Sequence, residues 1–357
     1  MNTIAIQTAA AGALSAALPV LLVIVGILLI ILVHELGHFV SAKLLGVQVN
    51  EFAIGFGPAI AKFQKGETKY AVRLLPLGGF CAMEGENEES DNPRAFGRKK
   101  VWRRIVIIAA GAVCNILLGF ILALAVFAPQ PDFQTTTISG FVKDAKSYET
   151  GLRAGDKIMK VNGRRIFTVS DLSYVLGTDG DGKFDMVVRR DKEKVRLGGI
   201  RFDTRKAQDG RTEILVDFGV ETVKNSFFTT IRESAMRTVS FARIIWMSLL
   251  DMITGKIALS EMSGPVGMVQ AGAQAASSGV SDMIGFLCII TINLGIFNLL
   301  PIPGLDGGRL LFLIVEGIRR KPVPPKYEGL IHAAGLVLLF GLVIVVTFKD
   351  IWKLITG

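Results

Sequence analysis

Two histidines separated by three residues form the part of the sequence with the clearest chemistry, His34-Glu35-Leu36-Gly37-His38. Residues four apart share one face of a helix, so two imidazoles at this spacing can bind a single zinc ion. Glu35 would then serve as the general base for water activated by the metal. From these five residues alone, two satisfied polar side chains at a helix end remain an alternative.

The location of this motif favours the metal site. No charged residue occurs between Met1 and Val33, so the motif ends a membrane-length apolar run. The chain has only three histidines, and two of them form this pair. An ionisable side chain within a membrane span costs roughly 3 kcal/mol on insertion scales, and such residues usually mark function. The pattern therefore predicts hydrolytic zinc chemistry inside a bilayer.

The composition is that of an integral membrane protein with some aqueous mass. Half of the 357 residues are apolar and 20% are charged, which makes a soluble fold a poor fit. The net charge of +9 comes without a basic stripe of interleaved aromatics, so we expect no nucleic-acid partner. Three widely separated cysteines imply no disulfide framework.

Four apolar segments are long enough to cross a hydrocarbon core of about 30 Å, which needs roughly 20 residues. They are Ala17 to Val40, Ile105 to Phe127, Met283 to Leu300 and Leu330 to Phe348. No Lys or Arg precedes the first span, whereas eleven lie between Lys43 and Arg104. The positive-inside rule therefore places this connection and the one between spans three and four in the cytoplasm, and both termini outside. The histidine motif is then expected near the cytoplasmic face.

A catalytic zinc uses three protein ligands and keeps a fourth position for water, so a further ligand is needed. The third span runs into Pro301 and Pro303, which cannot continue a regular helix, and Asp306 follows. Irregular backbone at membrane depth is tolerated where protein or a watery cavity surrounds it. We expect Asp306 on a bend level with the histidines. Its alternative role is to cap a helix over Gly308 to Ile318.

Two motifs together resemble the bacterial site-2 protease family, zinc intramembrane metalloproteases of the RseP, RasP and Eep type. They are His34-Glu35-Leu36-Gly37-His38 and Asn298-Leu-Leu-Pro301-Ile-Pro303-Gly-Leu305-Asp306-Gly307. The resemblance implies His34, His38 and Asp306 as zinc ligands and Glu35 as the catalytic base. It also implies that Asn293 and Asn298 contact the substrate backbone. Hydrogen bonding between helices is the alternative for the two asparagines.

A substrate helix must be unwound before it is cut, which leaves polar backbone groups in need of partners. The segment Tyr70 to Phe80 reads as β-structure, and Gly78 and Gly79 allow close backbone approach. Strand addition is the expected mode of substrate binding. The resemblance implies a membrane-associated β-hairpin here, preceded by a motif matching Gly55-Phe56-Gly57-Pro58. A purely structural cytoplasmic hairpin is the alternative.

One segment departs from the family pattern. In the second span, Gly111-Ala112-Val-Cys-Asn115 resembles a Gly-Pro-x-x-Asn motif but lacks its proline. This difference puts the local helix geometry in question, not the chemistry.

The long connection between the second and third spans resembles a PDZ domain. The segment Gly151-Leu-Arg-Ala-Gly155-Asp156-Lys-Ile158-Met-Lys-Val161-Asn162-Gly163 meets every fixed position of that pattern, and Asn162-Gly163 is a common hairpin turn. Such a domain could bind an extended C-terminus or act as a size filter, and both readings stay open. Beyond it, apolar residues at helical spacing over Ser226 to Thr254 predict an amphipathic helix on the outer membrane face.

The expected fold is a polytopic α-helical membrane protein with four transmembrane helices, a membrane-associated β-hairpin and an extracytoplasmic PDZ-like α+β domain. The expected domains are residues 1–127 with spans 1 and 2, 128–217 as the PDZ domain, 218–282 as a helical region, and 283–357 with spans 3 and 4.

The resemblance implies a zinc-dependent intramembrane endopeptidase of the bacterial cytoplasmic membrane. Its implied substrates are single-span membrane proteins, namely anti-sigma factors after ectodomain trimming and remnant signal peptides, and membrane lipid surrounds it. Two alternatives from other classes are a membrane zinc-binding or transport protein and a proteolytically silent PDZ adaptor. The sparse His and acidic residues along the spans disfavour transport, and the intact Glu35 disfavours the adaptor.

Overall fold

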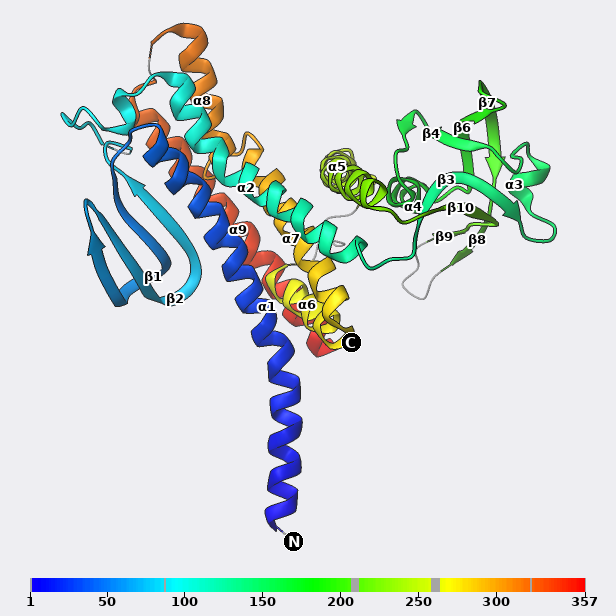
Figure 1. The fold of residues 1–357 in the computed structure, drawn as a ribbon, viewed down its shortest axis with the longest axis horizontal. Helices are drawn as coiled ribbons and strands as arrows, with labels where there is room; N and C mark the ends of the chain where they lie inside the picture. Colours follow the sequence, from blue (N-terminus) through cyan, green and yellow to red (C-terminus); the bar gives the residue numbers. More distant parts are fainter. Residues whose placement is uncertain (1, 87, 207–211, 258–263, 322, 357) are drawn as a thin grey trace. The chain divides into compact units, whose positions relative to one another are not determined.

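The computed structural model describes residues 2–86, 88–206, 212–257, 264–321 and 323–356, and it divides into two compact units (Figure 1). The membrane unit comprises Met1–Leu122 and Met262–Gly357, so it joins the two ends of the chain. The sheet unit comprises Ala123–Glu261. The histidine motif and Asp306, far apart in sequence, therefore belong to one unit.

The helices of the membrane unit are α1 (Asn2–Leu44), α2 (Val101–Phe127), α6 (Pro265–Ser278), α7 (Val280–Leu299), α8 (Asp306–Arg319) and α9 (Pro325–Thr356). Four stretches within them are long and apolar enough to cross a membrane, namely Ala17–Leu44, Val101–Phe127, Val280–Leu299 and Tyr327–Thr356. The four predicted spans are confirmed as helices of that length and character. A short 3-10 helix, η1 (Phe96–Arg98), precedes α2.

Glycines let α1 approach its neighbours closely. A Cβ atom at Gly26 would lie 2.7 Å from a methyl group of Leu287 on α7. One at Gly37, within the histidine motif, would lie 2.9 Å from the carbonyl carbon of Ala110 on α2. Contacts this short leave no room for a side chain, so α2 packs directly on the turn of α1 that carries the motif.

Two long antiparallel strands, β1 (Val49–Lys65) and β2 (Thr68–Met83), follow α1. The first part of β1 pairs on both sides, because Ile54 lies opposite Gly79 and also opposite Val72. The segment Gly79–Met83 therefore forms an outer edge of this small sheet. The predicted strand over Tyr70 to Phe80 is confirmed within β2.

The motif Gly55 to Pro58 does not precede the hairpin, as we expected, but lies inside β1. Gly55 and Gly57 have φ values of +86° and +83°, a conformation that side chains other than glycine rarely adopt. These two residues bend β1, and both halves of the strand pair with Tyr70–Val72 of β2, on its opposite sides. The resemblance, which placed this motif before the hairpin, gave no indication that it lies within a strand.

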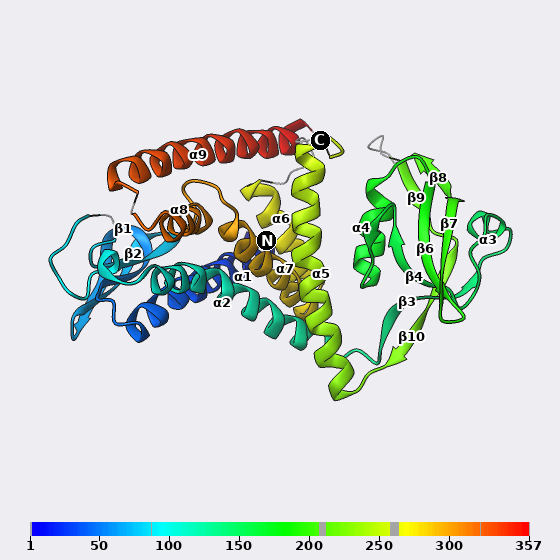
Figure 2. The same ribbon diagram turned by 90° about the horizontal axis from the view of Figure 1, so that it is seen from above.

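The chain between α7 and α8 is irregular, as the prolines predicted. Helix α7 ends at Leu299 and α8 begins at Asp306, with Pro301 and Pro303 between them. The backbone amide of Gly304 donates a hydrogen bond to Nδ1 of His332 on α9, at 2.9 Å. Seen from above, α8 lies between α2 and α9 (Figure 2). The loop that carries Asp306 is thereby held from the α9 side.

The sheet unit is built on strands in the order β10-β3-β4-β6-β7, with β5 paired to β4, and a separate β8-β9 pair. The strands are β3 (Asp132–Phe141), β4 (Lys157–Val161), β5 (Arg164–Arg165), β6 (Lys183–Arg190), β7 (Glu193–Arg201), β8 (Asp203–Lys206), β9 (Thr212–Leu215) and β10 (Phe218–Lys224). Its helices are α3 (Lys146–Glu149), α4 (Val169–Thr178) and α5 (Phe227–Ile253). The buried core includes Ile138, Leu152, Ile158, Val161, Phe184 and Ile200.

Helix α5 confirms the helix predicted over Ser226 to Thr254. Ser226 caps it, because its hydroxyl accepts a hydrogen bond from the amide of Thr229, whose own hydroxyl accepts from the Ser226 amide. Two charged contacts join α5 to the rest of the unit, Arg164 with Asp251 and Arg243 with Asp171. The predicted position of α5 on the outer membrane face stays a prediction.

Candidate metal centre

Three donor atoms converge in the membrane unit. Nε2 of His34 lies 3.1 Å from Oδ2 of Asp306, and Nε2 of His38 lies 3.2 Å from the same oxygen. The two Nε2 atoms are 3.2 Å apart. Both histidines are buried, and the Asp306 side chain is 21% exposed. Within the described chain, these are the His, Cys, Asp and Glu residues whose arrangement could hold a metal ion.

The triangle fits zinc. Tetrahedral ligation at about 2.0–2.1 Å separates ligand atoms by roughly 3.3 Å, close to the three distances observed. Oδ2 of Asp306 is buried and accepts no hydrogen bond, although two ring nitrogens face it. Two imidazole nitrogens and a carboxylate oxygen thus lie within 3.2 Å of one another, as they would around a single cation. Three protein ligands leave the fourth position of a tetrahedral zinc for water.

Asp306 is the first residue of α8, and Leu305 occupies the N-cap position without a side-chain hydrogen bond. The alternative in which Asp306 caps this helix is therefore wrong, because its carboxylate is turned toward the histidines. Close packing holds this position. A Cβ at Gly307 would lie 2.5 Å from the carbonyl carbon of Leu299, and one at Gly308 would lie 2.6 Å from the Ile302 carbonyl oxygen.

The second nitrogen of each ring faces α2. Nδ1 of His38 donates a hydrogen bond to the backbone carbonyl of Ile107 at 2.9 Å, which leaves its Nε2 lone pair free for a metal. Nδ1 of His34 lies 3.4 Å from the side-chain amide of Asn115. Gly111 makes this approach possible, because a Cβ there would lie 2.8 Å from Cε1 of His34 and would also collide with His38.

These α2 contacts were not predicted as functional. The carbonyl of Ile107 carries no signature in the sequence, because every residue has one. Gly111 and Asn115 were noticed as a pattern whose missing proline cast doubt on helix geometry. In the structure α2 is an ordinary helix from Val101 to Phe127, so that doubt does not apply. The spacing of four residues could have suggested that both face the histidines.

Glu35, the predicted base, is half-buried on the turn between the two histidines. A Cβ at Gly79 would lie 3.2 Å from Cγ of Glu35 and 3.0 Å from the carbonyl oxygen of Ala53. Gly78 has a φ of +99°, and the ring of Phe56 occupies the space that a side chain at this position would need. The structure therefore brings Gly79 directly beside Glu35, at the edge of the small sheet.

Asn293 and Asn298 lie on α7, the helix that packs against α2 at this depth. Thr291 donates a hydrogen bond to the Asn115 carbonyl at 3.1 Å, and Gly295 lies against the Ala112 carbonyl. Oδ1 of Asn293 is buried without a hydrogen-bond partner. Within the described residues, neither asparagine hydrogen-bonds to the three donor groups. A role in contacting substrate stays a prediction.

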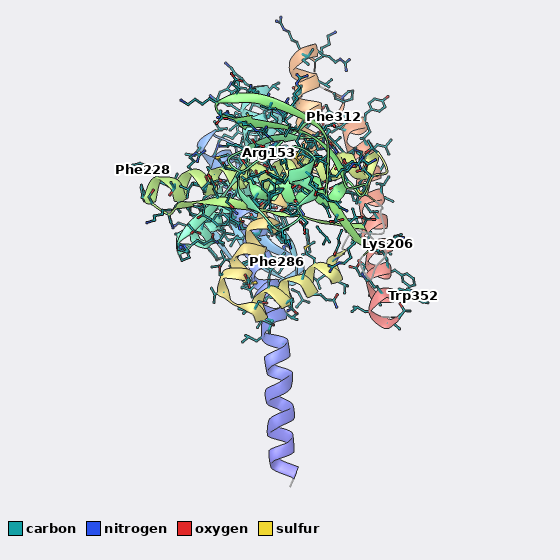
Figure 3. The ribbon with its side chains drawn as sticks, turned by 90° about the vertical axis from the view of Figure 1, so that its right-hand side faces the viewer. Arg153, Lys206, Phe228, Phe286, Phe312 and Trp352 are labelled. Atoms are coloured by element: carbon teal, nitrogen blue, oxygen red, sulfur yellow. The ribbon has the colours of Figure 1, made fainter. Side chains whose placement is uncertain are left out.

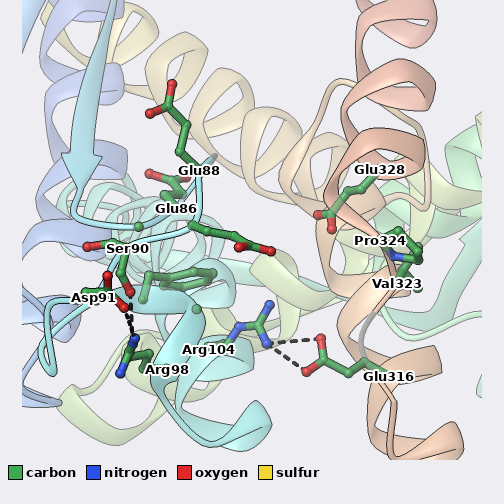
Figure 4. Close-up of a pocket in the computed structure, with 15 residues that line it drawn as sticks. Glu86, Glu88, Ser90, Asp91, Arg98, Arg104, Glu316, Val323, Pro324 and Glu328 are labelled. Carbon is green, nitrogen blue, oxygen red and sulfur yellow. Dashed lines mark hydrogen bonds and ion pairs between the residues drawn. The ribbon is translucent and has the colours of Figure 1, made fainter.

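A cavity of about 690 Å³ lies next to the loop that follows β2 (Figure 4). Its charged lining is mostly acidic and consists of Glu86, Glu88, Glu89, Asp91, Glu316 and Glu328, with Arg98 and Arg104. Arg104 pairs with Glu316 at 2.8 Å, and Arg98 pairs with Asp91 at 2.7 Å. Glu86 forms an ion pair with Arg309, which lies three residues after Asp306 on α8. The Arg104–Glu316 pair connects α2 to α8, and the Glu86–Arg309 pair connects the loop after β2 to α8, the helix that begins with Asp306.

Comparison with known proteins gives a consistent result. The family model described as Peptidase family M50 matches residues 22–342. A protein of Clostridium perfringens is 34% identical over 90% of this chain and 95% of its own length. The zinc metalloprotease RasP of Bacillus licheniformis is 30% identical, over 90% of this chain and 96% of its own. The regulator of sigma-W protease RasP of Bacillus subtilis is 29% identical, over 90% and 95%.

Proposed function

Because this chain belongs to peptidase family M50, the site-2 proteases, and is a zinc metalloprotease of the membrane, we propose that it cleaves the transmembrane segments of single-span proteins at the His34, His38 and Asp306 cluster. The convergence of three donor atoms at 3.1–3.2 Å carries this proposal. Membership of the family supports zinc as the metal, and the distances support these three residues as its ligands.

In the proposed reaction His34, His38 and Asp306 would hold the zinc, which would supply Lewis-acid chemistry when bound, acidifying water and polarising a peptide carbonyl. Glu35 accepts the proton of the attacking water and returns it to the departing amide nitrogen. Its position on the helical turn between the two imidazoles supports this role. Half-burial of this carboxylate limits competing contacts with bulk water.

We propose that substrate binds by strand addition along Gly79–Met83. This segment pairs with Val49–Ile54 on one side, and in the described structure no other strand pairs with its second side. An unwound substrate could complete its hydrogen bonds on that free edge, which removes the penalty of exposing backbone in lipid. The absence of a side chain at Gly79 supports a close approach of this edge to Glu35. Asn293 and Asn298 would contact the same extended backbone from α7.

The proposed substrates include anti-sigma factors that have already lost their ectodomains. Support comes from the name of the Bacillus subtilis relative, a regulator of sigma-W protease. Remnant signal peptides are the second proposed class and rest on family resemblance. Both are single spans, and an enzyme embedded in the bilayer meets them by lateral diffusion.

We further propose that the protein lies in the bacterial cytoplasmic membrane with both termini extracytoplasmic and the metal centre near the cytoplasmic face. The distribution of Lys and Arg supports this topology. The proposed domains keep their predicted boundaries, 1–127, 128–217, 218–282 and 283–357. The second of these would be an extracytoplasmic PDZ domain, for which the Asn162-Gly163 turn between β4 and β5 gives local support.

The test is cleavage of a single-span substrate by the full chain reconstituted in lipid. Glu35→Gln should abolish cleavage while the zinc content, measured by elemental analysis, stays at one ion per chain, because the ligands are untouched. The matched control is Glu88→Gln, which removes an exposed carboxylate of the same unit and should leave cleavage unchanged. Cleavage by the Glu35→Gln protein at the wild-type rate would overturn the proposed mechanism.

A further inference from the structure

Asn115 is fully buried on α2 with one polar atom that lacks a partner. Its Nδ2 atom lies 3.4 Å from Nδ1 of His34, and its backbone carbonyl accepts a hydrogen bond from Thr291. Its Oδ1 atom is buried and unpaired. A buried polar atom without a partner typically costs about 1–3 kcal/mol, so this arrangement needs an explanation.

The amide can adopt a second orientation. The two ends of an Asn amide have nearly the same shape, and a half-turn about the last side-chain bond exchanges Nδ2 and Oδ1. After this exchange the oxygen faces Nδ1 of His34, and Nδ2 takes the position that Oδ1 held. If Nε2 of His34 is a metal ligand, the ring proton resides on Nδ1, and Oδ1 can accept it. One rotation therefore gives the imidazole the acceptor that this tautomer needs.

His38 shows the same arrangement with a different acceptor. Its Nδ1 donates to the Ile107 carbonyl, so both rings direct Nδ1 toward α2 and Nε2 toward Asp306. Gly111, between these two contact points on α2, clears the space for both imidazoles. Helix α2 thus offers one backbone acceptor and one side-chain acceptor to the two rings.

We propose that Asn115 is a positioning residue that accepts the Nδ1 proton of His34 through Oδ1 and thereby fixes the tautomer that binds zinc. This inference rests on the proposed ligand role of His34. Without the acceptor, neutral imidazole can place its proton on Nε2, where it blocks the metal. Loss of such an outer contact typically weakens metal affinity 10–100-fold.

The experiment measures zinc affinity of the purified full chain by competition with a chelator. Asn115→Leu removes the acceptor at similar size and should weaken affinity about 10–100-fold. Asn115→Asp keeps an acceptor but can no longer donate, so its affinity should stay within a few-fold of wild type. If the amide instead donates to His34, Asn115→Asp should lose affinity as Asn115→Leu does, and the proposal fails. The affinity of Asn115→Asp relative to wild type remains decisive if the Leu variant does not fold.

Thr291→Val is the matched control, because it removes the other hydrogen bond to Asn115 and leaves the side-chain amide in place. It should bind zinc as the wild type does, and a loss equal to that of Asn115→Leu would show a packing effect and overturn the proposal.

His34→Ala separates this inference from the proposed function. If His34→Ala abolishes zinc binding while Asn115→Leu does not weaken it, only the role of Asn115 is wrong. If His34→Ala binds zinc normally, the ligand assignment itself falls.

A second, independent feature is a strongly basic cavity of about 710 Å³ in the sheet unit. Six cationic side chains line it, from Lys157, Lys160, Arg165, Arg189, Lys194 and Arg196. No acidic residue is among the described lining, and none of the six forms an ion pair within the described chain. Charges of one sign therefore gather here without compensation.

The strand register places these cations against one another. Arg189 on β6 lies opposite Lys157 on β4 and opposite Lys194 on β7. Like charges directly opposite in a sheet are destabilising by roughly 0.2–1 kcal/mol per pair. A sheet face that repels itself in this way is stabilised when an anion binds it.

Apolar groups accompany the charges. Met159, Val187 and Met236 line the same cavity, the last from α5. At the start of α5, Phe227 and Phe228 are 74% and 80% exposed. Phe228 is labelled in Figure 3. Exposed Phe side chains suit the apolar face of an interfacial helix, and Lys and Arg side chains are attracted to an anionic membrane surface. We infer that this cavity binds the headgroups of anionic phospholipids.

Native mass spectrometry of the full chain tests this inference, with phosphatidylglycerol or phosphatidylcholine added to the detergent. The triple variant with Lys157, Arg189 and Lys194 changed to Gln should retain fewer phosphatidylglycerol molecules than wild type and equal phosphatidylcholine. The control changes Lys192, Lys206 and Lys224 of the same unit to Gln, an equal change in charge outside the cavity. Equal losses in both variants would overturn the inference. Binding of an acidic poly-glutamate peptide is measured in the same way. If the cavity variant binds lipid as wild type does but no longer binds this peptide, the cavity is a polypeptide site and the inference is overturned.

Discussion

Gly79 lies so close to Glu35 that a Cβ atom on the glycine would be 3.2 Å from Cγ of the glutamate. The edge of the β1-β2 sheet and the predicted general base are therefore in direct contact. A peptide added to that edge would enter the site with its backbone next to the carboxylate. In the proposed function the small sheet would hold an extended chain, and the metal motif would cut it.

Gly79→Val should lower the cleavage rate of a single-span substrate at least tenfold. The added side chain would press on Glu35 and on the Ala53 carbonyl, 3.0 Å from the Cβ position, and so displace the base or the strand edge. Zinc content should not change. Gly285→Ala is the control, since no atom lies within 4 Å of its Cβ position. Equal rates for Gly79→Val and wild type would show that this contact is dispensable.

Gly111→Ala should reduce both zinc content and cleavage. The methyl group would stand 2.8 Å from Cε1 of His34 and closer still to His38, so α2 must move away or the rings must turn. Either response breaks the contact of His38 with the Ile107 carbonyl. Elemental analysis of the purified variant, next to Gly285→Ala, gives the answer. A full zinc complement in Gly111→Ala would mean that α2 does not constrain the histidines.

The Arg164–Asp251 pair should make the sheet unit sensitive to acid. The hydrogen bonds from the Arg164 guanidinium hold the pKa of the Asp251 carboxyl below its ordinary value, and the carboxyl is only 2% exposed. Since the folded pKa is depressed, the pair contributes its stability above about pH 4 and loses it as the pH falls through the lower folded value.

Asp251→Asn should therefore destabilise the contact of β5 with α5 by about 2 kcal/mol at pH 7 and by less at pH 3. Hydrogen exchange of the β5 and α5 amides in the full chain measures this difference. Arg205→Gln is the control, because its pairing with Glu213 is exposed and should contribute little. An equal loss of protection at both pH values would contradict the assigned role of the pair.

Much of this architecture could be predicted from sequence. Length and hydropathy were enough for four spans, because lipid requires long uninterrupted apolar helices. Two prolines after Leu300 predicted the break that brings Asp306 to the histidines. Apolar residues at helical spacing over Ser226 to Thr254 predicted α5, which runs from Phe227 to Ile253.

Features that depend on tertiary contacts were beyond sequence reasoning. The carbonyl of Ile107 acts through the backbone, which has no residue-specific pattern. The bend at Gly55 and Gly57 accompanies the pairing of the two halves of β1 with opposite sides of Tyr70–Val72, which single residues do not reveal. Nδ1 of His332 accepts a hydrogen bond from the Gly304 amide on the loop before Asp306, a contact that no sequence motif marks. Such contacts join segments far apart in the chain.

The zinc content of the Asp306→Asn protein tests the central claim most directly. The amide keeps the shape of the side chain but loses its charge, so zinc measured by elemental analysis should fall well below one ion per chain, and cleavage should fall with it. Asp350→Asn, which alters another carboxylate of the membrane unit, should retain zinc. A wild-type zinc content in the Asp306→Asn protein would contradict the assignment of Asp306 as the third ligand.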